Sequence, residues 1–112
     1  NGLENHKKIL NLLGLATKAG KTASGGFMTE KSVKGGKAFL VLVPEDASDN
    51  TKKMFFNMCT YYKVPIYLFG RKEELGHAIG RETRTSVAVL DAGFSKALAK
   101  QIELNGGSEY EG

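Results

Sequence analysis

The chain has few of the residues that build metal centres and disulfides. It contains no tryptophan, one cysteine, two histidines and two prolines among 112 residues. The single cysteine, Cys59, excludes an internal disulfide and a cysteine cluster around zinc. His6 and His77 have no cysteine or histidine nearby at metal-ligand spacing. We therefore expect two surface histidines, no bound metal and no cofactor.

Long apolar runs are also missing. No stretch approaches the roughly 18 apolar residues that a membrane-spanning helix requires, and no segment resembles a secretory signal. A lone cysteine is common in proteins of a reducing compartment. These features predict a cytoplasmic protein without membrane contacts.

Motifs for catalysis are absent or misplaced. The segment from Gly14 to Thr22 resembles a phosphate-binding loop, but five residues separate Gly14 from Gly20 where that motif has four. The neighbouring carboxylates Glu45–Asp46 and Glu73–Glu74 suit helix caps better than a paired acid and base. No nucleophile elbow or dinucleotide fingerprint occurs. We expect a protein that is not an enzyme.

Apolar periodicity predicts helices that alternate with short strands. The strands are continuous apolar runs, which is typical of strands covered on both faces. The expected fold class is therefore α/β, a three-layer α/β/α sandwich around a central, mostly buried mixed sheet with parallel pairing in its middle. We expect one domain over residues 1–104 and a disordered, polar, glycine-rich tail over 105–112. The predicted helices are 4–19, 25–34, 49–62, 72–79 and 92–104, and the predicted strands are 38–43, 66–69 and 86–90.

Positive charge is concentrated in the first third of the chain. The net charge is +4 overall, but residues 1–37 carry seven lysines against two acids, a local charge of +5. Within this third, Ser24 precedes Gly25 and Gly26, a pattern that predicts a helix start with Ser24 as its cap. Free N–H groups at a helix start attract anions such as phosphate. The distribution favours an anionic polymer as the partner.

The predicted helix after Gly25 presents a basic face. Phe27, Lys31 and Lys34 fall within about 60° of one another at 3.6 residues per turn. Lysines on one face are often only a solvated surface, and Phe27 is compatible with a core position or a hydrophobic staple. A cationic face with an aromatic ring also suits a nucleic acid, which offers phosphates and stackable bases.

A second candidate surface is the polar loop over residues 80–86. Arg81 and Arg84 are suited to phosphates or bases, and Thr83 and Thr85 offer hydroxyl groups. In a layered α/β fold, loops at one end of the sheet lie together. We therefore expect this loop and the glycine-opened helix start to form two walls of one electropositive cleft, which fits a bent or bulged nucleic acid better than a straight duplex.

Several motifs in combination resemble a known family. They are Gly25–Gly26 with Lys31, the segment 33–38, Glu45–Asp46–Ala47, Lys63–Val64–Pro65–Ile66, and 74–80. Together they resemble the kink-turn RNA-binding ribosomal-protein family of the L-seven-Ae type, and the resemblance extends to about Leu104. It implies an α/β/α sandwich that binds sharply kinked RNA without catalysis.

The resemblance also implies roles for particular residues. Gly25 and Gly26 match the start of the family's second helix, and Lys31 matches its phosphate- or guanine-contacting lysine. Phe27–Met28 replaces the family's typical Asn–Glu pair and is unable to make the same base hydrogen bonds. Lys21 and Lys34 are expected at flanking phosphates, and Arg81, Thr83, Arg84 and Thr85 around an extruded base.

The expected partner is RNA, of ribosomal origin and kinked, rather than DNA, with ribosomal proteins as further candidates. The arginines in the loop suggest more reliance on phosphate contacts and a stronger dependence on salt. Two alternatives stay open. Phe27 and Met28 would anchor a protein partner if the chain is an interaction adaptor. A small-molecule enzyme would require a deep pocket lined by Glu45, Asp46 and His77.

Overall fold

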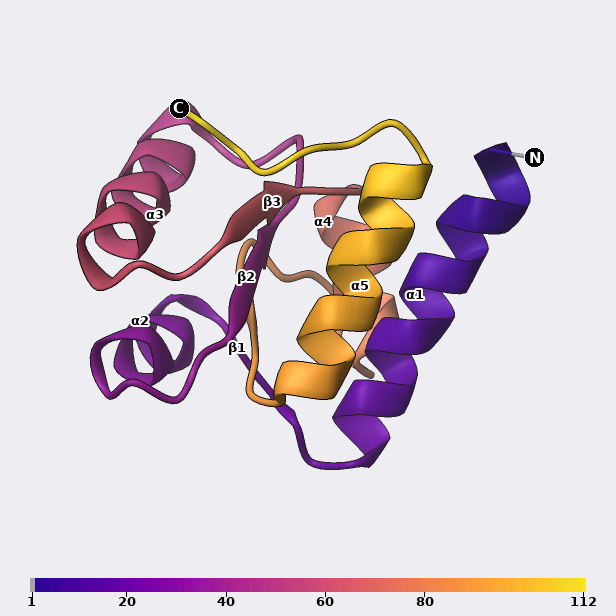
Figure 1. The fold of residues 1–112 in the computed structure, drawn as a ribbon, viewed down its shortest axis with the longest axis horizontal. Helices are drawn as coiled ribbons and strands as arrows, with labels where there is room; N and C mark the ends of the chain where they lie inside the picture. Colours follow the sequence, from indigo (N-terminus) through magenta and orange to yellow (C-terminus); the bar gives the residue numbers. More distant parts are fainter. Residues whose placement is uncertain (1) are drawn as a thin grey trace.

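Helices and strands alternate along the chain in the computed structural model, which describes residues 2–112 (Figure 1). Of the helices in that range, none combines the length and apolar character that crossing a bilayer would need. The helices are α1 (Gly2–Lys18), α2 (Gly26–Lys34), α3 (Asp49–Tyr62), α4 (Lys72–Ala78) and α5 (Ala92–Leu104). The strands are β1 (Thr22–Ser24), β2 (Leu40–Val43), β3 (Ile66–Leu68) and β4 (Val87–Val89).

The four strands form one mixed sheet in the order β1-β4-β2-β3. The expected mixed sheet is confirmed, but parallel pairing is confined to β2 and β3, because β4 runs antiparallel to both β2 and β1. The loop after α4 explains this direction. The loop runs back along α4 to the first residue of that helix, where the Arg84 N–H donates to the Lys72 carbonyl at 3.0 Å. The chain thus enters β4 from the end of the sheet where α4 begins.

Strand β1 was not expected from the sequence. Thr22, Ala23 and Ser24 are all half-buried and form no apolar run. The strand exists because its backbone pairs with β4, where Ala23 is opposite Ala88 and Ser24 is opposite Val87. This pairing brings the start of α2 to the end of the sheet where β4 begins.

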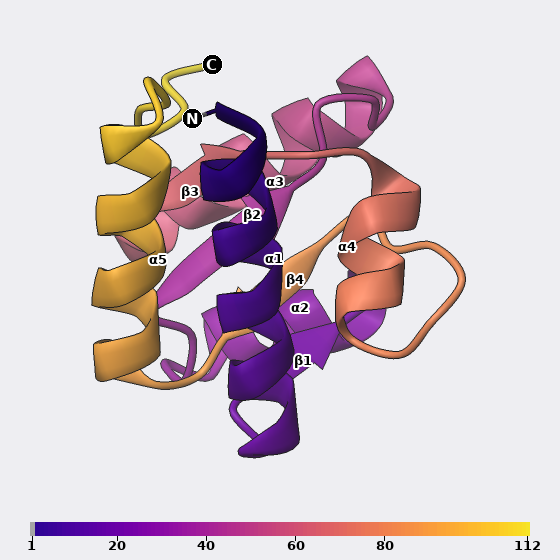
Figure 2. The same ribbon diagram turned by 90° about the vertical axis from the view of Figure 1, so that its right-hand side faces the viewer.

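Alternation along β2 divides the core into two layers. Leu40 and Leu42 belong to a cluster with residues of α1, α4 and α5, whereas Val41 and Val43 pack with residues of α2 and α3. All four side chains are buried because helices cover both faces. Figures 1 and 2 show α1, α4 and α5 on one side of the sheet and α2 and α3 on the other. The predicted α/β/α sandwich is therefore the observed fold.

The residues after α5 differ from the expected disordered tail. They run along the outer edge of β3, where Glu109 forms an antiparallel bridge with Tyr67 and the Tyr110 N–H donates to the Ile66 carbonyl at 2.7 Å. The Tyr110 ring meets the Phe56 ring edge-on at a centroid distance of 5.5 Å. An edge strand offers unpaired backbone groups, and the tail satisfies them here.

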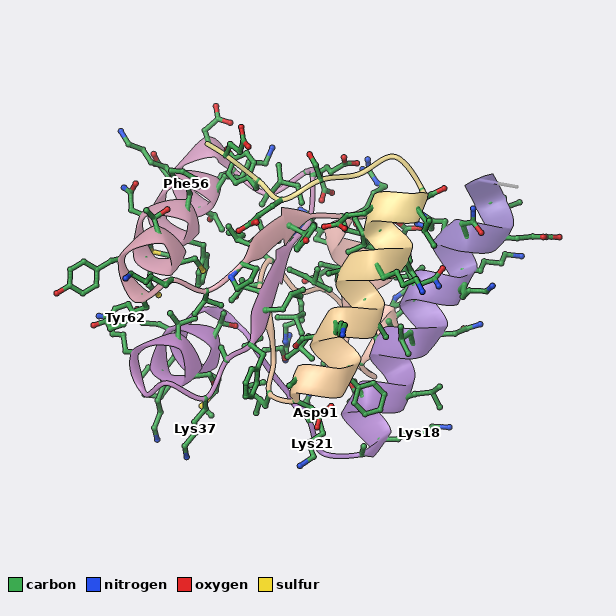
Figure 3. All side chains as sticks on the ribbon, in the orientation of Figure 1. Lys18, Lys21, Lys37, Phe56, Tyr62 and Asp91 are labelled. Atoms are coloured by element: carbon green, nitrogen blue, oxygen red, sulfur yellow. The ribbon has the colours of Figure 1, made fainter. Side chains whose placement is uncertain are left out.

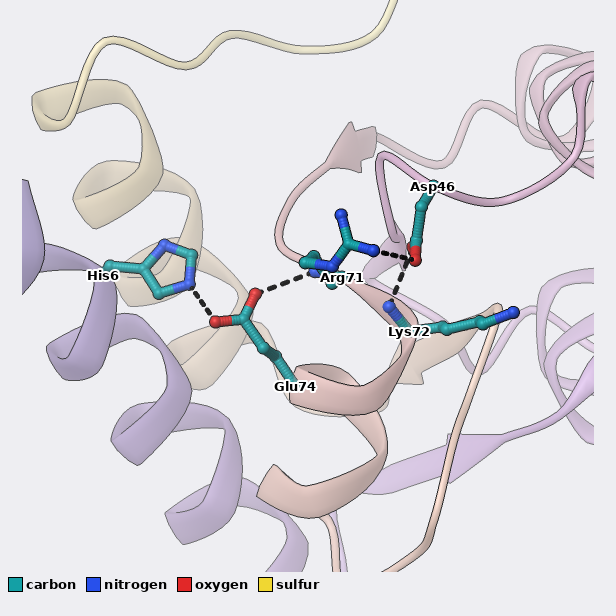
Figure 4. A network of polar contacts seen from close by, with 5 residues as sticks. All are labelled: His6, Asp46, Arg71, Lys72 and Glu74. Carbon is teal, nitrogen blue, oxygen red and sulfur yellow. Dashed lines mark hydrogen bonds and ion pairs between the residues drawn. The ribbon is translucent and has the colours of Figure 1, made fainter.

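A polar network fixes the start of α4 (Figure 4). The Glu74 carboxylate interacts with His6 Nε2 at 2.8 Å and accepts from the Arg71 N–H at 2.9 Å. Asp46 accepts from the Lys72 N–H at 2.9 Å, and the Arg71 guanidinium lies 3.6 Å from the same carboxylate. The expectation that these acids cap helices is correct, and His6 is a half-buried partner rather than a free surface residue.

Candidate nucleic-acid interface

The start of α2 and the loop before β4 are joined directly. The Gly25 N–H donates to the Ser86 carbonyl at 3.1 Å, which extends the β1–β4 pairing by one step. Two segments that are far apart in the sequence therefore meet at one end of the sheet. The two surfaces that the sequence suggested are neighbours in the fold.

Arg84 spans the junction between these surfaces. Its Nε donates to the Ser24 hydroxyl at 2.9 Å, and its Nη1 donates to the Thr83 carbonyl at 2.8 Å. These bonds hold a half-buried guanidinium at the start of α2. A guanidinium has more N–H donors than these two contacts use, so it retains donors for an anion.

Ser24 does not cap α2, contrary to the sequence prediction. It is the last residue of β1, and its hydroxyl is occupied by Arg84. The cap is Gly25, with φ 87° and ψ 158°, a conformation that favours glycine. Gly25 makes no side-chain cap hydrogen bond to the first turn of α2, and such uncapped N–H groups are the kind that attract anions.

Space around this end is open. A Cβ atom built on Gly25 or Gly26 would meet no atom within 4 Å. Gly26 also lacks a positive φ, so the fold itself does not require glycine there. The absence of a side chain leaves room for another backbone to approach the free N–H groups.

A buried hydroxyl pair supports the first turn of α2 from below. The Ser86 hydroxyl donates to the Thr29 hydroxyl at 3.0 Å, and both residues are fully buried. The sequence does not reveal this pair, because a hydroxyl residue beside an apolar strand is equally compatible with a loop. The pair ties α2 to the beginning of β4.

The outward face of α2 carries the expected residues. Phe27 is 77% exposed and Met28 44% exposed, so neither belongs to the core. Lys31 is exposed and lies six residues beyond Gly25, roughly 9 Å along the helix. Lys34 is exposed but pairs with Glu30 at 2.7 Å. This hydrogen bond and the Glu30 charge raise the pKa of Lys34.

The loop residues Arg81, Thr83 and Thr85 are exposed. The Arg81 N–H donates to the Gly76 carbonyl at 2.8 Å, which fixes one end of the loop on α4. Gly76 is buried under the loop, and a Cβ there would meet the Glu82 carbonyl oxygen at 2.6 Å. The loop is thus held close to α4, with its polar side chains directed outward.

Lys21 lies apart from this junction. Its carbonyl accepts from the Leu90 N–H at 2.7 Å, which places it at the opposite end of β1, roughly 13 Å from Gly25 at about 3.3 Å per strand residue. Figure 3 shows Lys21 on the same lower edge of the view as Lys18 and Lys37. The structure therefore does not bring Lys21 together with Arg84.

The residues named for an enzymatic site are also separated. Glu45 lines shallow depressions beside the C-terminal tail, whereas His77 lines a different one with Leu10 and Gly14. Within residues 2–112, no group of three or more His, Cys, Asp or Glu side chains is arranged to hold a metal ion. The geometry offers no support for the small-molecule alternative.

The fold and this junction define a class of protein: an α/β/α sandwich that presents a glycine-opened helix end beside an arginine-bearing loop. The chain belongs to the ribosomal protein L7Ae/L30e/S12e/Gadd45 family, whose profile matches residues 7–99. The family predicted from the sequence motifs is therefore confirmed.

Curated relatives carry related names. The chain is 44% identical over 92 residues to the RNA-binding protein YlxQ of Bacillus subtilis (strain 168), a match that covers 82% of this chain and 92% of that protein. It is 30% identical over 97 residues to the large ribosomal subunit protein eL8 of Thermoplasma volcanium, covering 86% and 80%. These are names of RNA-binding and ribosomal proteins, in agreement with the expectation that the chain is not an enzyme.

Solved structures share the fold. A protein of unknown function from Bacillus halodurans C is 40% identical, with a TM-score of 0.83, and the match covers 86% of this chain and 97% of that one. The 15.5kD RNA binding protein of Giardia lamblia has a TM-score of 0.74 with coverage of 92% and 88%. Its identity is 22%, so this second likeness concerns the fold alone.

Proposed function

We propose that this chain is a non-catalytic RNA-binding protein that recognises kink-turn or similarly bent RNA. Membership in the L7Ae/L30e/S12e/Gadd45 family and similarity to proteins named YlxQ and eL8 support this function. The ribosomal name of eL8 favours ribosomal RNA as the partner, with ribosomal proteins nearby and a cytoplasmic location.

The observation that carries the proposal is the junction of Arg84, Ser24 and Gly25. It combines free N–H groups at the start of α2 with a guanidinium held in place by two hydrogen bonds. Phosphates of a continuous duplex follow a regular path, whereas a bend brings phosphates of both strands close together. A compact site with donors on two walls therefore suits bent RNA.

The second turn of α2 extends this site. Lys31 supplies a mobile positive charge, and Arg81 supplies another at the far side of the loop. Phe27 and Met28 offer apolar contact in place of hydrogen bonds to base edges. Binding by this chain accordingly relies on backbone amides, phosphate contacts and stacking, and weakens steeply as salt is raised.

A binding assay with two RNAs tests the proposal. One RNA is a kink-turn stem, and the other is a straight duplex of equal length and composition. We expect tighter binding of the kinked stem, and equal affinity for both would refute recognition of the bend.

Paired lysine variants locate the surface. We expect Lys31→Ala to weaken binding of the kinked stem about five- to tenfold, on the scale of roughly 1 kcal/mol or more for a charge-assisted contact. Lys100→Ala, an exposed lysine on α5, is the matched control and should leave the affinity nearly unchanged. Equal losses in the two variants would show that the surface is placed incorrectly.

A protein-interaction adaptor remains the second candidate because Phe27 and Met28 are adjacent and exposed. Exposed neighbouring apolar side chains can anchor a protein partner. The two functions are separated by Gly26→Ala, which adds one methyl group in open space beside the free N–H groups. Weaker RNA binding in this variant supports the RNA function of the start of α2, whereas a wild-type chain that does not bind the kinked RNA favours the adaptor.

A further inference from the structure

Two exposed aromatic rings stand at the end of α3. Tyr61 is 78% exposed and Tyr62 40% exposed. The buried side chains of this helix are Phe55 and Cys59, so neither tyrosine belongs to the core. The two tyrosine rings form an edge-to-face pair, with centroids 4.9 Å apart and planes at 74°. This arrangement orients the rings while leaving ring surface open to solvent.

Positive side chains surround the tyrosine pair. Lys63 follows directly in the chain and is exposed. Lys34 of α2 lies near Tyr62. The pKa of Lys34 is raised mainly by Glu30 and to a smaller extent by Tyr62. Figure 3 shows Tyr62 where the end of α3 approaches α2. Because Glu30 pairs with Lys34, the net positive charge beside the tyrosines comes from Lys63.

The tyrosine pair continues the outward face of α2. Phe27, Lys31 and Lys34 share one side of that helix, opposite its buried residues Thr29 and Val33. The face begins at the proposed RNA junction and ends beside Tyr62. The outward surface from the start of α2 to the end of α3 thus carries Phe27, then two lysines and then the tyrosine pair.

The backbone at Lys63 provides a separate observation. Lys63 has φ 59°, and it is the one non-glycine residue with positive φ between residues 2 and 112. Glycine is the usual residue at this position after a helix. A lysine in this conformation places its charge next to the tyrosines and lowers the stability of the fold. Residues with a strained backbone are often found at functional sites.

We propose that unpaired bases of RNA leaving the kinked segment stack on Tyr61 and Tyr62, while Lys63 contacts the phosphates. This inference rests on the proposed function, because the kinked segment must be seated at the start of α2. Lysine is depleted in the cores of protein–protein interfaces. Aromatic rings beside a basic track are instead the usual platform for single-stranded nucleic acid.

The test compares three RNAs. One is the kink-turn stem alone, and the other two are the same stem with a short unpaired pyrimidine extension at one end or at the other. Affinities are measured by fluorescence anisotropy for the wild-type protein and for Tyr61→Ala. We expect one of the extensions to strengthen wild-type binding about five- to twentyfold, within the range known for stacking of a base on an aromatic side chain.

Tyr61→Ala should abolish this gain and bind the stem alone as the wild type does. Leu15→Ala on α1 is the control, since Leu15 is also exposed, at 56%, but lies in the opposite layer. Lys63→Gly should keep or raise the melting temperature, because glycine suits the positive φ, and should reduce the gain from the extension.

A direct readout uses Tyr61→Trp, which introduces a tryptophan into a chain that has none. Its fluorescence should change with the extended RNA and not with the stem. The inference is overturned if no extension adds affinity or if Tyr61→Ala retains the gain. Either result is expected if the tyrosine surface binds a protein instead of RNA. Failure of the wild type to prefer the stem over a straight duplex would instead reject the proposed function itself.

Discussion

Replacing Gly76 with alanine tests how the arginine loop is held over α4. The added Cβ would lie 2.6 Å from both the Glu82 carbonyl oxygen and the Thr83 Cα, at least 0.8 Å closer than ordinary contact at 3.4 Å. Both are backbone atoms, so no side-chain rotation relieves the overlap. Overpacking of this kind costs about 1–3 kcal/mol, and alanine returns about 1 kcal/mol through its helix propensity. We expect a net loss of up to about 2 kcal/mol.

The overlap should also displace the loop and therefore weaken RNA binding. Arg84 is positioned through the Lys72 carbonyl and Ser24, and a shifted loop disturbs both contacts. Urea unfolding measures the stability, and binding of the kink-turn stem measures the displacement. Gly26→Ala is the control for stability, since its Cβ meets nothing within 4 Å. If Gly76→Ala proves more stable than the wild type and binds RNA unchanged, the loop does not lie over α4 as described.

Three further outcomes follow from the structure. Burial raises the pKa of the Cys59 thiol to about 12 from 9.0. The stability that comes from keeping this thiol neutral should be complete below about pH 9 and lost as the pH rises towards 12. At neutral pH, a thiol reagent should react with Cys59 only after unfolding. Ser86→Ala should lower the free energy of unfolding by about 1–3 kcal/mol by leaving the buried Thr29 hydroxyl without its donor, and Ser86→Ala combined with Thr29→Val should recover part of that loss in urea unfolding. Tyr110→Ala should cost about 1 kcal/mol by removing the ring contact with Phe56, with little effect on RNA affinity; an unchanged melting temperature would contradict the docked tail.

The elements that the sequence predicted correctly are those with a strong local signal. The apolar run around β2 indicated a strand covered on both faces, and Leu40 to Val43 are all buried. Apolar spacing likewise located α1 and α5, because each helix needs one stripe for the core. These patterns depend on neighbours in the chain, so the sequence alone contains them.

The features that the sequence did not reveal depend on distant partners. Strand β1 forms through pairing with β4, and the antiparallel direction of β4 follows from a loop that folds back on α4. The same pairing turns Ser24 away from a capping role, because Arg84 occupies its hydroxyl. It also separates Lys21 from the junction, since a strand intervenes. Local spacing does not encode such contacts.

The contact between Arg84 and Ser24 joins positions 60 residues apart, so its two partners come together only when the sheet is complete. An RNA that requires this contact has little affinity for the unfolded chain. Thermodynamic linkage then makes the RNA a stabiliser, worth about 2.7 kcal/mol when its free concentration is about a hundred times the Kd. A chain that folds beside its RNA would thus be shielded from proteolysis at the moment it becomes able to bind.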